Sequence, residues 1–141
     1  MIAYTTVLLI SSIIMVLSFY TKNRYLNLIS LAGGASSNLF LTKPIGDIGN
    51  HIGNISTSQI EINTHYSSKI YYFFELFDFP PFEQIKIFLF ITTLLIPIIF
   101  FIKKIYNPLF YLFYFYAFIP YYTNYLTHGF ASIIFIIFVL N

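Results

Sequence analysis

His128 has the surroundings that most favour chemistry. It follows Thr127 in a short window of polar and tyrosine residues between two apolar stretches. An ionisable group in such a setting is a functional hypothesis by default, and an imidazole can ligate a haem iron or relay a proton. We favour a structural role, in which one ring nitrogen is hydrogen-bonded to a carbonyl, hydroxyl or water, because the sequence offers no second intramembrane His for a haem. His128 is the one candidate for cofactor binding.

Four further titratable residues could gather around a metal ion. They are His51, His65, Asp47 and Glu61, all in the polar part of the chain. Their spacing matches no known metal site, and the glycine-rich sequence around them predicts a flexible loop. We therefore predict no metal site.

Glu75 and Asp78 are three residues apart in a run of aromatic residues. One helical turn would place both carboxylates on one side and the rings on the other. This pattern favours an amphipathic segment at a membrane interface. Proton handling is the functional alternative, because carboxyl groups near a membrane can have shifted pKa values.

Several classes of function are excluded by residue types that the chain lacks. It has no Cys, hence no thiolate nucleophile, iron–sulfur cluster or cysteine zinc site. The sequence contains no phosphate-binding glycine loop and no nucleophile elbow. The net charge of +2 is too small for a nucleic-acid footprint. We predict no catalytic residue, no enzyme activity and no nucleic-acid partner.

The candidate residues are set among three long stretches that contain no charged residue. These stretches are 2–20, 87–102 and 105–141. A bilayer core about 30 Å thick needs roughly 20 apolar helical residues. Only 9% of the residues are charged, against roughly 25% in an average soluble domain. The sequence therefore predicts an all-α membrane protein with about three transmembrane helices and one long, largely irregular extramembrane loop.

The expected segments follow one another along the chain. Residues 44–55 repeat an Ile-Gly step three times, which favours an extended, turning chain. The predicted organisation is a transmembrane helix at 1–21, a polar extramembrane loop at 22–70, an aromatic interfacial segment at 71–86, a second transmembrane helix at 87–102, and a kinked third one with a C-terminal extension at 105–141.

Particular residues refine this picture. Ser11 and Ser18 are seven residues apart, hence on one face, where small hydroxyl residues allow a neighbouring helix to approach closely. Tyr4 and Tyr20 are placed as interfacial aromatic residues. Pro97 is expected to kink its helix or to expose one carbonyl to a neighbour.

The orientation in the membrane is left open by the sequence. Lys22 and Arg24 follow the first span, and Lys103 and Lys104 follow the second. With one loop between two spans, these pairs are expected on opposite sides, so the rule that basic residues stay inside gives no answer.

The residue usage resembles that of hydrophobic subunits encoded by AT-rich mitochondrial genomes, such as those of ciliates. Ile, Phe, Tyr and Asn dominate the chain. The expected layout is also similar to that of NADH dehydrogenase subunit 3. The chain departs from that family, which has a loop cysteine and acidic residues in its second span, whereas 87–102 contains none.

The resemblance implies a non-catalytic integral subunit of a respiratory-chain complex in the mitochondrial inner membrane. Its partners would be other membrane subunits and the bilayer. No cofactor would be bound by this chain alone, and lipids such as cardiolipin are the expected ligands. The alternatives are a membrane-sector subunit of the mitochondrial ATP synthase and a small oligomeric transporter. A transporter would need to oligomerise, because three spans without intramembrane charges cannot form a polar pathway.

Overall fold

The computed structural model describes residues 2–46, 48–56, 79–105, 107–120, 131–135 and 138, and all regular structure within them is helical. Residues 131–135 form a short helical segment near the C-terminus. The principal elements are α1 (Ile2–Thr21), α2 (Arg24–Ser36), the 3₁₀ helix η1 (Ser37–Phe40), α3 (Ile48–Ser56), α5 (Pro81–Ile102), α6 (Pro108–Phe113) and the π-helical turn η3 (Tyr114–Phe118).

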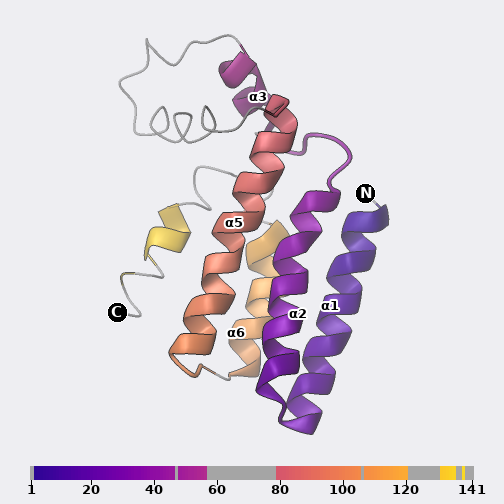
Figure 1. The fold of residues 1–141 in the computed structure, drawn as a ribbon, viewed down its shortest axis with the longest axis vertical. Coiled ribbons are helices and arrows are strands. Elements are labelled where there is room, and N and C mark those ends of the chain that lie inside the picture. The colour runs from indigo at the N-terminus through magenta and orange to yellow at the C-terminus, as the bar shows by residue number, and fades with distance from the viewer. Residues whose placement is uncertain are drawn as a thin grey trace.

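Four helical columns lie side by side and alternate in direction (Figure 1). They are α1, α2, α5, and α6 continued by η3, and α2 contacts both α1 and α5. The turn between α1 and α2 and the turn between α5 and α6 therefore meet at one end of the bundle. The N-terminus and α3 lie at the other end.

The two turns at that shared end use the same geometry. Lys22 and Lys104 both have a φ of 53°, the left-handed conformation that commonly ends a helix. The N–H of Asn23 donates to the Ser18 carbonyl (3.0 Å), and the N–H of Ile105 donates to the Phe100 carbonyl (2.9 Å). These bonds satisfy carbonyls at the ends of α1 and α5 and reverse the chain within a few residues.

Asparagine starts the returning helix after each turn. The Asn23 side chain accepts hydrogen bonds from the N–H groups of Tyr25 (3.0 Å) and Leu26 (3.3 Å). Asn107 accepts one from Leu109 (3.0 Å), and Pro108 occupies the first helical position, where its missing N–H costs nothing. These caps fix the start of α2 and of α6.

Two adjacent glycines bring α2 close to α1 on one side and to η3 on the other. A Cβ on Gly33 would lie 2.5 Å from Ser11 Oγ of α1, and a Cβ on Gly34 would lie 2.5 Å from Cε1 of Phe115 in η3. Ser11 and Ser18 are both buried, which confirms the predicted close-approach face of α1.

The predicted irregular loop at 22–70 is wrong for the residues that form α2, η1 and α3. The glycines and serines that favoured a loop let α2 pack between α1 and α5, and packing outweighs the low helix propensity of glycine. In α3, buried Ile48 and partly buried Ile52 lie one turn apart against the core, so the Ile-Gly repeat becomes an amphipathic helix. Residues 57–78 lie outside the described residues.

The second predicted span begins earlier than expected. The helix is Pro81–Ile102 rather than 87–102, because Pro81 occupies a first-turn position with Pro80 as the N-cap residue. Of the predicted interfacial segment 71–86, residues 81–86 are part of this helix, and 71–78 lie outside the described residues.

Within the predicted third span at 105–141, the structure describes α6 and η3, which are shorter than a membrane span, and the helical residues 131–135. The middle of this predicted span, 121–130, lies outside the described residues. Tyr20 is exposed at the end of α1, and Tyr4 near its start is buried in the core cluster. Their placement at the membrane interface stays a prediction.

Candidate functional site

The bundle buries a set of small polar residues beside its apolar core and exposes large apolar residues on its outside. Two of its helices, α1 and α5, are long and apolar enough to cross a membrane. The outer face of α1 exposes Ile10, Ile13 and Leu17, each by more than half. The buried polar residues on the long helices and their partners are Ser11, Ser12, Ser18, Asn27, Ser30, Ser37, Asn38, Gln84, Thr92 and Thr93.

Most buried hydroxyl groups are satisfied within their own helix. Ser18 Oγ donates to the Met15 carbonyl at 2.6 Å, and Thr92 Oγ1 donates to the Phe88 carbonyl at 2.6 Å. A hydroxyl bonded in this way needs no water, so it can face another helix in an apolar medium. These groups therefore serve helix packing.

A polar contact joins three helical columns at the carbonyl of Thr93. Pro97 has no N–H, so it cannot give this carbonyl the usual helical hydrogen bond from four residues later. The hydroxyl of Tyr114 lies 3.1 Å from the Thr93 carbonyl and 3.3 Å from the Leu31 carbonyl of α2. The prediction that Pro97 exposes a carbonyl to a neighbour is confirmed.

Asn38 extends this contact to η1. Its Nδ2 lies 3.2 Å from Thr93 Oγ1 and 3.2 Å from the Ala35 carbonyl. Both Asn38 and Thr93 are fully buried. The contact thus fixes the position of α2 and η1 relative to α5.

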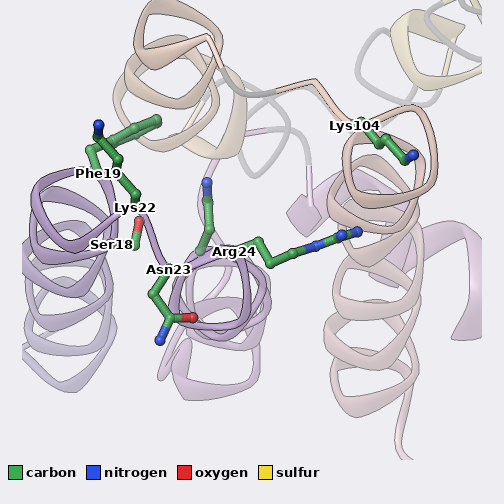
Figure 2. A pocket seen from close by; sticks show the side chains of 7 residues that line it. Ser18, Phe19, Lys22, Asn23, Arg24 and Lys104 are labelled. Atoms are coloured by element: carbon green, nitrogen blue, oxygen red, sulfur yellow. The ribbon is translucent and has the colours of Figure 1, made fainter.

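A basic pocket of about 380 Å³ lies at the shared end of the bundle (Figure 2). It is lined by residues in and beside the α1–α2 turn and by Lys104 of the α5–α6 turn. Figure 2 shows the Arg24 side chain extending toward the side on which Lys104 lies. The lining residues are Ser18, Phe19, Lys22, Asn23, Arg24, Asn27 and Lys104.

Contacts with aromatic rings support the pocket. The Arg24 guanidinium lies 4.8 Å from the centre of the Phe101 ring, a cation–π contact that links α2 to α5. The Phe19 ring packs on Tyr111 at a centroid distance of 5.2 Å. Asn27 is 5% exposed, and its Oδ1 is buried with no hydrogen-bond partner among the described residues.

The positive charge of the pocket is not neutralised within the part of the chain that the structure describes. The only acidic residue there is Glu83, which pairs with Lys86 at 2.7 Å. That pair lies near the start of α5, at the opposite end of the bundle. Lys103 adds a further cation beside Lys104.

The residues that the sequence singled out do not form this pocket. His51 is buried in α3, and no group of three His, Asp or Glu residues that could hold a metal occurs among the described residues. The other candidates lie outside the described residues: His128, His65, Asp47, Glu61, Glu75 and Asp78.

Sequence reasoning missed the basic pocket because it placed the two basic pairs on opposite sides. Since α2 returns along α1, Lys22 and Arg24 lie at the same end as Lys103 and Lys104. The available signal was the repeated combination of a lysine after an apolar helix with an asparagine shortly beyond it, which is typical of a tight helix reversal.

Comparison of the chain with protein-family models, with curated proteins and with solved structures gives no match. The layout that resembled NADH dehydrogenase subunit 3, one span followed by a long loop, is replaced in the structure by a helical hairpin of α1 and α2. Function is therefore argued from the geometry.

Proposed function

We propose that this chain is a non-catalytic integral membrane subunit, embedded through α1 and α5, of a respiratory-chain complex in the mitochondrial inner membrane. The observation that carries the membrane placement is the apolar outer surface of the long helices. Exposed Ile and Leu residues on α1 would face lipid, and its serines face α2. In water this arrangement would leave a large apolar surface uncovered.

The structural role is supported by what the buried polar groups do. Hydroxyls on α1 and α5 bond to carbonyls of their own helix, and the Tyr114 hydroxyl bonds to the carbonyl that Pro97 frees. The bonds within a helix leave its buried hydroxyls satisfied, and the Tyr114 bond joins η3 to α5; none of them needs a substrate. The mitochondrial setting is supported by the abundance of Ile, Phe, Tyr and Asn, which are encoded by AT-rich codons.

Partner subunits would cover aromatic surface that the bundle leaves open. Leu109, Phe110, Phe113 and Tyr116 are each at least half exposed on α6 and η3. Such a column packs efficiently against another membrane helix, because aromatic rings bury much area per residue.

Fractionation of native membranes tests this proposal. We expect the chain to stay in the membrane pellet after alkaline carbonate extraction, and to migrate in mild detergent with an assembly far larger than 16.5 kDa. The assembly should contain respiratory-chain subunits. Release by carbonate would contradict the membrane placement. Co-migration with the ATP synthase, or as a homo-oligomer, would contradict the respiratory assignment.

The fold also gives an orientation to test. Four basic residues, Lys22, Arg24, Lys103 and Lys104, lie at one end of the bundle, and the rule that basic residues stay inside places that end in the matrix. The chain has no Cys, so single introduced cysteines can be labelled without background. We expect Thr21→Cys to react with a membrane-impermeant maleimide only when the matrix side is accessible.

The matched variant lies at the other end of the bundle. Pro44 is exposed beyond η1, and Pro44→Cys should be labelled only from the intermembrane side. Neither substitution changes the charge that sets the orientation. Labelling of both cysteines from the same side would contradict the proposal that the two ends of the bundle lie on opposite sides of the membrane.

A further inference from the structure

The geometry points to the basic pocket as a binding site for the phosphate group of an anionic phospholipid. This inference rests on the membrane placement proposed above. Lys22, Arg24 and Lys104 line a single pocket of about 380 Å³, although they come from two turns that are 80 residues apart in sequence. A volume of this size accommodates a phosphate and part of the group attached to it.

The side chains suit a phosphate better than a carboxylate peptide or a neutral ligand. With the Phe101 ring near its guanidinium, Arg24 is anchored while it retains N–H groups that can donate to phosphate oxygens. Lys22 and Lys104 add point charges that do not require a fixed bonding direction. The Asn27 amide oxygen lacks a partner among the described residues; as an acceptor it suits a hydroxyl of the group attached to the phosphate rather than a phosphate oxygen.

The left-handed turns place one lysine at each of the two turns that border the pocket. Lys22 directly follows α1 and Lys104 lies two residues beyond the end of α5, each with a φ of 53°. Glycine or asparagine is the usual residue in this conformation, and a lysine is strained there. The bundle thus places a cation at two positions where an uncharged residue would be more stable.

The surface around the pocket favours a lipid over free phosphate. Leu17 and Tyr20 of α1, Ile102 of α5 and Leu109 of α6 are exposed near the two turns. Acyl chains could lie along these apolar residues while the phosphate occupies the pocket at the level of the headgroups. Inorganic phosphate would gain nothing from that surface.

The test is native mass spectrometry of the full chain in mild detergent, titrated with phosphatidylglycerol or with phosphatidylcholine of the same acyl chains. We expect one phosphatidylglycerol to bind at least tenfold more tightly than phosphatidylcholine. Removal of one cation should weaken phosphatidylglycerol binding about fivefold. Lys22→Asn and Lys104→Asn are the informative variants, because asparagine removes the charge and suits the left-handed conformation.

These variants separate folding from binding. The double variant should be as stable as the wild type and bind phosphatidylglycerol about 25-fold more weakly, with phosphatidylcholine binding unchanged. Lys43→Gln, which removes an exposed cation beyond η1, should retain full binding. The proposed site would be disproved if Lys43→Gln weakened phosphatidylglycerol binding as much as the double variant does, or if the double variant bound this lipid as tightly as the wild type.

Two controls complete the test. One distinguishes a lipid phosphate from inorganic phosphate, and the other distinguishes a failure of this inference from a failure of the proposed membrane placement. Inorganic phosphate at millimolar concentration should not displace the lipid; displacement would show a site for soluble anions instead. Carbonate extraction of the double variant should match that of the wild type. A chain that resists extraction and shows no lipid preference would disprove this inference alone, whereas an extractable chain would disprove the membrane placement.

Discussion

Gly34→Ala is expected to destabilise the bundle by about 1–2 kcal/mol, although alanine is the better helix former. The added Cβ would lie 2.5 Å from Cε1 of Phe115, 3.1 Å from its Cδ1 and 3.2 Å from Cδ1 of Ile119. Both neighbours are fully buried, so the ring cannot swing into solvent. Overpacking should therefore exceed the gain of about 1 kcal/mol in helix propensity. Denaturant-induced unfolding in detergent micelles, followed by helical circular dichroism, measures the change.

Gly53→Ala is the matched control because it makes the same substitution in α3. A Cβ there has no atom within 4 Å, so only the helix propensity changes. Its effect should be neutral or stabilising by up to about 1 kcal/mol. Opposite signs for the two variants would confirm that α2 and η3 touch at Gly34. Equal effects would contradict this packing.

The neighbouring glycine offers a second comparison. At Gly33 the atom in the way is Ser11 Oγ, at 2.5 Å, whereas Ser11 Cβ is 3.4 Å away. A hydroxyl can rotate aside, so Gly33→Ala should cost less than Gly34→Ala. Combining it with Ser11→Ala removes the clash and should recover the stability.

The same two glycines explain what the sequence could and could not predict. The helices α1 and α5 were predictable, because length and hydropathy are local properties of their residues. The helix α2 was not, since Gly33, Gly34 and the nearby serines resemble a loop when read alone. Their role becomes visible only when α1 and η3 are in place on either side.

The basic pocket was hidden for a related reason. The composition of each turn is evident in the sequence, but whether Lys22 and Lys104 line the same pocket depends on the direction in which α2 runs. By contrast, the effect of Pro97 was predictable, because a missing N–H frees a carbonyl whatever surrounds it. The structure identifies the donor as Tyr114. Tyr114 lies in the third predicted span, whose position beside the second span did not follow from the sequence.

Tyr114→Phe should destabilise the bundle by about 1–2 kcal/mol, since it removes the side-chain donor to the Thr93 carbonyl, which Pro97 cannot serve. The ring itself is retained and stays buried, stacked on Phe118 with centroids 6.2 Å apart. The Leu31 carbonyl, 3.3 Å from the hydroxyl, lies inside α2 and keeps a helical partner. The loss should therefore come from the carbonyl that Pro97 leaves open, and unfolding in micelles measures it.

A double-mutant cycle with Pro97→Ala tests that cause. Alanine at this position supplies the missing N–H to the Thr93 carbonyl, so the Tyr114 hydroxyl becomes redundant. In the Pro97→Ala background, Tyr114→Phe should cost less than about 0.5 kcal/mol, a coupling of roughly 1 kcal/mol. Asn38→Leu in both backgrounds is the control, because Asn38 contacts the Thr93 side chain rather than its carbonyl and should show no such coupling. If Tyr114→Phe costs the same with and without Pro97, the hydroxyl acts through Leu31, and the proline is not the reason that η3 packs against α5.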